Sequence, residues 1–380
     1  MIRYKKSVTC FVSSVAVIIS VTVAFGFFYD QSVRFLGEIA LCSVKTYLPL
    51  DNKEKLIIEN VKDESDNNTA SESLKKQKPK ETVNKKTEKS DSLTKTDSDI
   101  EKLIKNAAKT ASTDEKGGAI TEYTFTSEGV TDSFENVRVK NTNKTKISIE
   151  NKLSEKLELT VTDKEPAVLI YHTHTTETYQ LIDRDFYSKD FASRSNDKGV
   201  NMIRVGKAIC DELEKRGYKV IHDTTVYDKP YSGAYYRSED AVKALLKKYP
   251  SVQITLDIHR DAIQGESGTK TKPVATINGK KAAQIMIITG CQEEGNGITD
   301  LPEWEKNLAF ALNLQRNIEN SFKGLTRPVF FCDRSYNMGL TPLSLLVEIG
   351  TDANTLEEAV YSGKMFAVAL AQILEEYKEK

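Results

Sequence analysis

No aromatic residue occurs between Tyr47 and Tyr123, and this gap divides the chain of 380 residues into parts that must fold differently. Within the gap, residues 61–118 are rich in Lys, Ser, Thr and Asp, interleave both signs of charge and contain almost nothing to bury. Such a segment cannot offset the entropy of ordering its backbone, so we expect a disordered linker. The composition becomes globular from about Gly118, which leaves residues 119–380 as the folded part.

An uncharged apolar run lies near the N-terminus. Residues 8–28 contain no charged side chain over 21 positions, and Arg3, Lys5 and Lys6 precede them. A helix of this length spans the hydrocarbon core of a bilayer, which is ~30 Å thick. We therefore predict a cytoplasmic tail (1–7), a transmembrane anchor (8–28) and a juxtamembrane segment (29–60), with the rest of the chain extracytoplasmic. A cleaved signal peptide is the competing interpretation of the same run.

Charge and cysteine content exclude several classes of protein. The chain has 54 Lys+Arg against 55 Asp+Glu, so it is not a globally basic nucleic-acid binder. Its five cysteines are far apart in sequence and form no disulfide framework. It contains no H-E-x-x-H, no G-x-S-x-G and no P-loop motif. A serine or cysteine nucleophile therefore has no local support in the sequence.

Residues 119–380 alternate helical patterns with short strands that are apolar on both faces. Predicted helices include residues 201–216 and 303–322, and predicted strands include 253–258 and 345–349. This alternation is typical of a single layered α/β domain with a mostly parallel central sheet and flanking helices. In such sheets the functional site lies beyond the carboxyl ends of the strands.

Polar side chains stand at or near the ends of three of these predicted strands. They are His172, His174 and Glu177, then His259 with Arg260, then Glu348 within an apolar strand. Two histidines and a carboxylate are a typical catalytic zinc set, and a further carboxylate can act as general base. The spacing of His174 and Glu177 places both on one turn. We therefore predict zinc ligands His174, Glu177 and His259, with Glu348 as the base.

A structural interpretation of the same residues also stands. A single histidine at a strand end is more often a satisfied polar residue than a metal ligand, and a buried glutamate can simply pair with an arginine. His222, at the end of another predicted strand, is interpreted as structural. The combination of four such residues at three strand ends is what favours a metal hydrolase.

Several segments together resemble the stage II sporulation protein P family. They are VLIYHTHTTETY (168–179), VGKAICDELEKRGYKVIHDTT (205–225), YSGAYYRS (231–238), LDIHRDA (256–262) and LLVEIGTDANTLEEA (345–359). The resemblance implies a membrane-anchored zinc N-acetylmuramoyl-L-alanine amidase of endospore formers, acting on peptidoglycan during engulfment. It also implies an additional endopeptidase activity and a location between the mother-cell and forespore membranes. The partners it implies are a stage II sporulation protein D-type lytic transglycosylase and other engulfment membrane proteins.

The chain is more distantly similar to zinc cell-wall amidases with a phosphorylase/hydrolase-like fold. That likeness implies His174 and His259 as ligands and Glu348 as the catalytic glutamate. Those amidases take their middle glutamate from a position where this chain has only Asp197 as a carboxylate. The third ligand is therefore Glu177 or, alternatively, Asp197, while His172 is a second alternative and Arg260 a candidate substrate-binding group. A zinc carboxypeptidase acting on stem peptides and a non-catalytic wall-binding protein remain the alternative functions.

Overall fold

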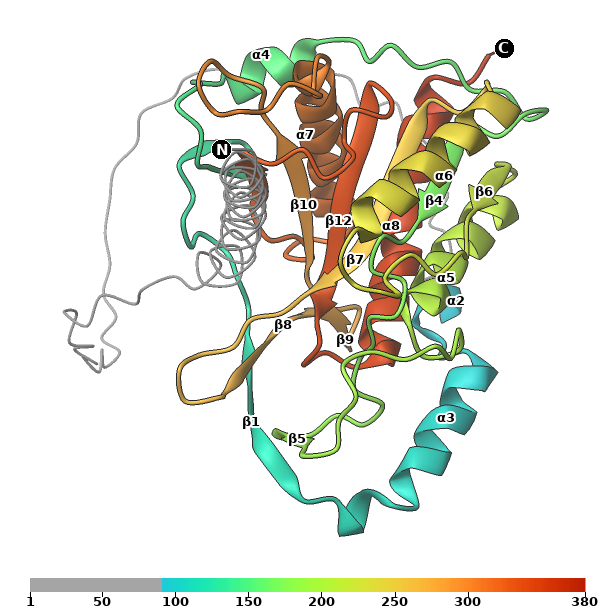
Figure 1. Ribbon diagram of the computed structural model, residues 1–380, viewed down its shortest axis with the longest axis vertical. Coiled ribbons are helices and arrows are strands. Elements are labelled where there is room, and N and C mark those ends of the chain that lie inside the picture. Colours follow the sequence, from blue (N-terminus) through green and yellow to red (C-terminus); the bar gives the residue numbers. More distant parts are fainter. Residues whose placement is uncertain (1–90, 380) are drawn as a thin grey trace, which may run out of the picture. The chain divides into compact units, whose positions relative to one another are not determined.

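A mixed eight-stranded β-sheet forms the centre of the protein (Figure 1). The computed structural model describes residues 91–379. Within them, neighbouring strands of this sheet make five parallel and two antiparallel pairs. In spatial order the strands are β2 (Asp132–Phe134), β3 (Val137–Asn141), β11 (Val329–Cys332), β10 (Ile285–Gly290), β12 (Leu343–Thr351), β7 (Ile254–Asp261), β4 (Val168–Tyr171) and β6 (Val220–His222). The predicted α/β domain with a mostly parallel sheet is confirmed.

Helices cover both faces of the sheet because its central strands are apolar on both sides. Val168 and Ile170 of β4 belong to the main core, whereas Leu169 and Tyr171 pack with Val242 in a separate cluster on the opposite face. Successive side chains of a strand point to opposite faces, so one short apolar run serves both layers. The helices on the main-core side are α5 (Met202–Lys215), α7 (Trp304–Ser321) and α8 (Leu356–Glu376), and the short α4 (Ile149–Ser154) lies beside α7. The opposite face is covered by α6 (Ala234–Lys248).

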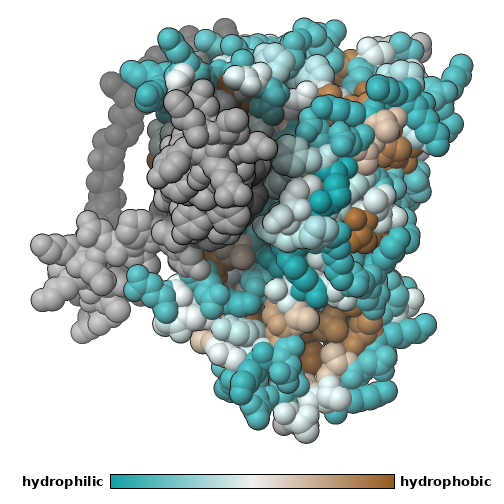
Figure 2. All heavy atoms as spheres, viewed as in Figure 1, coloured by the Kyte–Doolittle hydropathy of each residue, from teal (hydrophilic) through white to brown (hydrophobic). Residues whose placement is uncertain are grey.

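The segment immediately before the predicted domain is ordered, so the prediction of a disordered linker is wrong for residues 91–118. It forms α2 (Asp91–Thr94), α3 (Ser98–Ala108), the 3₁₀ turn η1 (Ala111–Thr113) and the start of β1 (Lys116–Tyr123). Ile100 is 1% exposed and packs into the main core. Figure 2 shows an apolar patch beside α3. We call residues 91–113 the docking segment.

Charge pairs complete the docking of this segment. Asp97 and Asp99 form ion pairs with Arg204 of α5, and Asp97 also pairs with Lys364 of α8. Burial acts to raise the pKa of Asp97, but the hydrogen bonds and charges of Lys364 and Arg204 outweigh it and lower the pKa. The segment is ordered because its acidic residues and the apolar side of α3 meet partners far along the chain, and composition alone does not reveal those partners.

A second, four-stranded sheet joins the docking segment to the rest of the fold. Its order is β5 (Phe186–Ser188), β1, β8 (Lys270–Ile277) and β9 (Lys280–Ala283). β1 pairs with both β5 and β8. β5 follows β4 along the chain and β8 follows β7, so β1 ties together the two segments that leave neighbouring strands of the central sheet.

The described residues do not test the predicted anchor. No helix within residues 91–379 is long and apolar enough to cross a membrane. The predicted tail, the predicted span at 8–28, the juxtamembrane segment and the linker up to residue 90 lie outside the described residues.

Candidate active site

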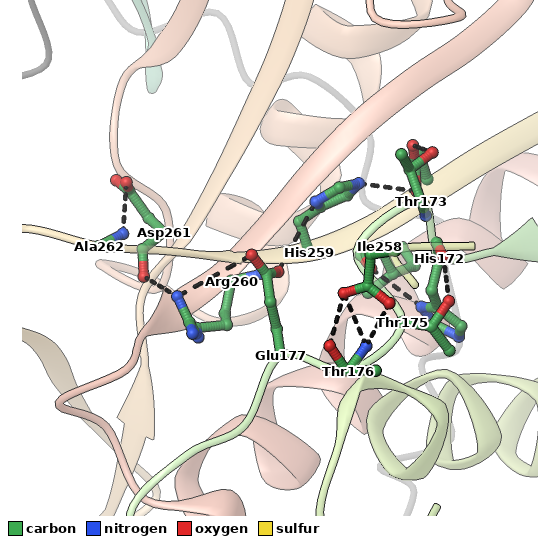
Figure 3. Close-up of polar contacts among 12 residues, drawn as sticks. His172, Thr173, Thr175, Thr176, Glu177, Ile258, His259, Arg260, Asp261 and Ala262 are labelled. Atoms are coloured by element: carbon green, nitrogen blue, oxygen red, sulfur yellow. Dashed lines mark hydrogen bonds and ion pairs between the residues drawn. The ribbon is translucent and has the colours of Figure 1, made fainter. Parts of the chain in front are cut away.

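Three adjacent parallel strands bring the predicted residues together. β7 lies between β4 and β12 and runs parallel to both. Glu348 of β12 is the register partner of His259 of β7, and the turn carrying His174 and Glu177 leaves the end of β4. The convergence expected from a parallel sheet is thus observed, and Figure 3 shows Glu177 pointing toward His259 and Arg260.

His259 is buried among carboxylates. Its Nδ1 lies 3.7 Å from Oε2 of Glu177, and its Nε2 lies 2.8 Å from Oδ1 of Asp257. The second contact is an ion pair when the imidazole is protonated, and it leaves Nδ1 as the ring nitrogen that faces Glu177. Burial acts to lower the pKa of His259, but the charges of Asp257, Glu177 and Glu348 outweigh it and raise the pKa to about 9. The site therefore attracts a cation.

Glu177 sits on the turn that the H-x-x-E spacing predicts, because its N–H donates to the carbonyl of His174 at 3.1 Å. Its Oε2 accepts the backbone N–H of Arg260 at 3.3 Å, and its Oε1 lies 3.4 Å from Nη2 of Arg194. These contacts orient the carboxylate so that Oε2 faces His259. Glu177 is consequently the better placed of the two candidates for a third ligand.

The guanidinium of Arg260 donates hydrogen bonds to backbone carbonyls of the protein. Nε donates to the carbonyl of Thr178 at 3.0 Å and Nη2 to that of Ser193 at 2.8 Å. The residue is 7% exposed. These bonds pin the loop around Glu177, so this geometry gives Arg260 a structural role and no support for the predicted contact with substrate.

His174 is half-buried, and its Nδ1 is buried without a hydrogen-bond partner among residues 91–379. Burial, with the charges of His259 and Arg194, lowers the pKa of His174 to about 3. The imidazole is therefore neutral at pH 7, which is the form that binds metals. The rings of His174 and His259 are 5.3 Å apart, edge to face.

Glu348 has one carboxylate oxygen, Oε2, that is buried without a partner in the described part of the chain. Burial raises the pKa of Glu348 to about 8, the nearby charges of Asp261 and Glu177 add to this, and His259 and Arg327 oppose it. A carboxyl group that gains and loses its proton near neutral pH suits general acid–base chemistry.

An irregularity in β12 follows Glu348 directly. The pairing register with β7 shifts between Glu348 and Thr351, and Gly350 has φ of 66°. Bulges of this kind re-aim side chains beside active sites. A Cβ at Gly350 would lie 2.5 Å from Oδ1 of Asn354 and 2.8 Å from Cβ of Ala283.

Gly350→Ala should therefore destabilise the protein by about 2 kcal/mol, because alanine is strained at positive φ and its methyl group has no space. It should also lower hydrolytic activity, because it displaces Glu348. Urea unfolding of the variant measures the first effect. Gly279→Ala is the matched control, since Gly279 has φ of 77° but nothing within 4 Å of an added Cβ. Equal losses for the two variants would contradict the role given to the crowded bulge.

His172 and Asp197, the alternative candidates for a metal ligand, make other contacts in the structure. His172 has both ring nitrogens occupied, Nδ1 by the carbonyl of Ile258 at 2.9 Å and Nε2 by Nε2 of His222 at 3.0 Å. Because a carbonyl only accepts, His172 carries its proton on Nδ1, and His222 donates to Nε2. Asp197 is exposed and accepts the N–H of Gly199 within its own turn.

Sequence reasoning missed Asp257, which is 1% exposed. Its carboxylate accepts the N–H of Thr173 at 2.8 Å and the hydroxyl of Thr173 at 2.6 Å, so it ties the turn before His174 to β7. The signal was present, because Asp257 and His259 are two apart on one strand and face the same side. Arg194 and Asp228, which meet at 2.5 Å beside Glu177, had no such signal.

The side chains fit a zinc ion in their chemistry, although no three His, Cys, Asp or Glu side chains among residues 91–379 already form a metal-binding group. His174 Nδ1 is buried without a hydrogen-bond partner among these residues, and His259 turns Nε2 to Asp257, so Nδ1 is the His259 nitrogen left for a metal. Two ligands at the Zn–N and Zn–O lengths of about 2.0–2.1 Å in a tetrahedral site lie about 3.4 Å apart, close to the 3.7 Å between His259 Nδ1 and Glu177 Oε2.

Fold and site together define an α/β protein with a histidine–glutamate centre at the ends of three parallel strands. Residues 38–371 match the model of the family described as stage II sporulation protein P, and the chain belongs to that family. It is 30% identical over 209 residues to stage II sporulation protein P of Bacillus subtilis (strain 168), covering 52% of this chain and 48% of the relative. The match thus spans about half the length of that relative.

Two of the solved structures with a low overall similarity to this chain are amidases. The CwlD amidase from Clostridioides difficile in complex with the GerS lipoprotein has a TM-score of 0.34 at 13% identity, covering 56% of this chain and 98% of that chain. The N-acetylmuramoyl-L-alanine amidase AmiC2 of Nostoc punctiforme has a TM-score of 0.32 at 12% identity, covering 55% and 97%. Likeness at these scores supports no inference about activity.

Proposed function

We propose that this protein is a peptidoglycan hydrolase of sporulation that cleaves the amide between N-acetylmuramic acid and L-alanine at a zinc site. Membership of the stage II sporulation protein P family supports the biological role. The observation that carries the chemistry is the convergence of three groups at adjacent strand ends: His174 Nδ1 and Glu348 Oε2, both buried without a partner within residues 91–379, and the His259–Glu177 pair at 3.7 Å. Buried polar groups without partners are rare and call for a function.

His174, Glu177 and His259 are the residues that hold the zinc ion in this proposal. When bound, the ion lowers the pKa of its water to about 7 and polarises the carbonyl to be attacked. His174 is already neutral at pH 7, whereas His259 must lose the proton that its carboxylate neighbours stabilise. Zinc binding should therefore release a proton.

Glu348 takes the proton from the attacking water and delivers it to the nitrogen of the departing L-alanine. Its place beside His259 across the β7–β12 pair puts it at the centre, and its raised pKa lets it return the proton near neutral pH. Asp257 holds His259 and the turn of His174 in register. Arg260 donates its backbone N–H to Oε2 of Glu177, and Arg194 pairs with Oε1.

The direct test is digestion of purified sacculi with zinc present, followed by mass spectrometry of the soluble products. Amidase action releases whole stem peptides with a new L-alanine amino group. A carboxypeptidase removes only terminal residues, an endopeptidase cuts the cross-links and a wall-binding protein releases nothing. Release of terminal residues alone, or activity that survives a chelator, would disprove the proposed reaction.

Asp257→Asn should weaken zinc binding about 10- to 100-fold, the usual cost of removing a carboxylate behind a ligating histidine. The fold should survive, because an asparagine oxygen can still accept the N–H of Thr173. Competition with a chromophoric chelator measures the affinity. Asp211→Asn, an exposed position on α5, is the control and should bind zinc like the unaltered protein. Unchanged affinity in Asp257→Asn would remove Asp257 from the site.

We also propose that residues 8–28 anchor the protein in the membrane, with the N-terminus cytoplasmic and the hydrolase facing the space between the mother-cell and forespore membranes. The uncharged run and its basic flank support this topology. A stage II sporulation protein D-type lytic transglycosylase and other engulfment membrane proteins are the partners proposed on the family resemblance. Protease treatment of protoplasts tests the topology, since only an extracytoplasmic domain is degraded while the membrane stays closed.

A further inference from the structure

His174 differs from the other candidate ligands in what fixes its orientation. Glu177 is held by Arg194 and Arg260, and His259 lies against Asp257 and Glu177. His174 makes no side-chain hydrogen bond to another residue of 91–379, at Nδ1 or at Nε2. Metal-binding histidines ordinarily donate their second ring N–H to an acceptor, which sets the angle of the ring. Something else must set that angle here.

Aromatic rings surround His174. Tyr231 stacks on its imidazole, with ring centroids 4.6 Å apart and planes 7° from parallel. Tyr235 approaches the imidazole edge-on, with centroids 5.6 Å apart and planes at 81°. Aromatic pairs in these geometries are worth about 0.5–1.5 kcal/mol beyond the area that they bury. The two tyrosines together restrict rotation of the imidazole about its bond to the backbone.

Tyr231 is itself held by a fixed charge. The guanidinium of Arg194 lies over its ring, 4.8 Å from the centroid. Arg194 is anchored by Asp228, whose side chain is fully buried, at 2.5 Å. Asp228 also accepts the N–H and the hydroxyl of Thr176, two residues after His174. The loop that carries Tyr231 is thus tied to the same turn that carries His174.

We propose that Tyr231, backed by Arg194, is a positioning residue that clamps the imidazole of His174 in the orientation needed for metal binding. This inference rests on the zinc site of the proposed function. Stacking here replaces the hydrogen bond that usually orients a metal-binding histidine. The aromatic ring of Tyr231, and not its hydroxyl, is the group that acts.

The test compares zinc affinity in the full-length protein and in three variants. Tyr231→Leu removes the ring, Tyr231→Phe keeps it, and Tyr236→Leu is the control because Tyr236 is 74% exposed on the same stretch of chain. We expect Tyr231→Leu to bind zinc about 10-fold more weakly in chelator competition, with the other two within about twofold of the unaltered protein. Thermal unfolding checks that each variant is folded.

A second measurement needs no metal. In zinc-free protein with labelled histidine, stacking on Tyr231 shifts the ring protons of His174 upfield, and this shift should vanish in Tyr231→Leu and persist in Tyr231→Phe. Unchanged zinc affinity in Tyr231→Leu, or an unchanged shift, overturns the clamp. If the unaltered protein fails to bind zinc, the proposed metal site fails, and the proton shift alone decides whether the stack exists in solution.

Discussion

Glu348→Gln should lower the rate of hydrolysis of sacculi by at least about 100-fold while leaving zinc affinity unchanged. The amide cannot take a proton from water, and general bases typically contribute 10²- to 10⁴-fold to rate. Zinc affinity should persist because His174, Glu177 and His259 are intact. Product release from sacculi and chelator competition measure the two quantities. Activity within about threefold of the unaltered enzyme would show that another group is the base.

The same variant should be more stable than the unaltered protein when zinc is absent. Burial raises the pKa of Glu348 to about 8, above the value of about 4.3 in an unfolded chain. The stabilising contribution of the protonated carboxyl is fully present below about pH 4 and is lost as the pH rises through about 8. Thermal unfolding with a chelator at pH 5, 7 and 9 should therefore show a gain for Glu348→Gln that grows with pH. A gain that is independent of pH would argue against the raised pKa.

A fragment of residues 119–380 should be less stable than residues 86–380 by on the order of 3 kcal/mol. It lacks Ile100, whose burial contributes roughly 2 kcal/mol, and the carboxylates that pair with Arg204, worth roughly 1 kcal/mol in a partly exposed position. It also begins within β1, which pairs with both β5 and β8. The hydrolytic activity of the shorter fragment should fall as well, because β5 and β8 lie in the segments that follow the site-bearing strands β4 and β7.

Urea unfolding of the two fragments measures the difference. Asp97→Asn with Asp99→Asn in residues 86–380 is the matched control, since it removes the ion pairs and keeps Ile100 and β1 whole. It should lose only the smaller, electrostatic part of the difference. Equal midpoints for the two fragments would show that the docking segment contributes nothing to the folded state.

The error at residues 91–118 has a definite physical origin. α3 places Ile100, Leu103 and Ile104 on one side, which is a helical spacing, but too few apolar residues surround them to predict a buried helix. The charged partners of Asp97 and Asp99 lie on α5 and α8, more than 100 residues along the chain. Composition measures what a segment can bury by itself, whereas docking depends on what the rest of the fold offers.

The candidate site, like the fold, could be predicted from the sequence only in part. His174 and His259 follow or end a buried apolar strand, and Glu348 lies within one. Such strands can be predicted from the sequence, because a strand covered on both faces must be apolar throughout. Since parallel strands end at a common edge, their convergence followed from local pattern and fold class alone. The alternation of Asp257 with His259 along the same predicted strand likewise indicates that both side chains face one side of the sheet.

What the sequence by itself determined is therefore the α/β layering, the edge where the site lies and the side chains that form its centre, because these depend on short-range periodicity. Only the tertiary structure decided which carboxylate faces His259, that His172 pairs with His222, that Arg260 is turned inward and that Tyr231 stacks on His174. Each of these contacts joins residues between 50 and 83 positions apart in the chain. Such contacts are set by how loops pack over the strand ends, and no local pattern of residues encodes that packing.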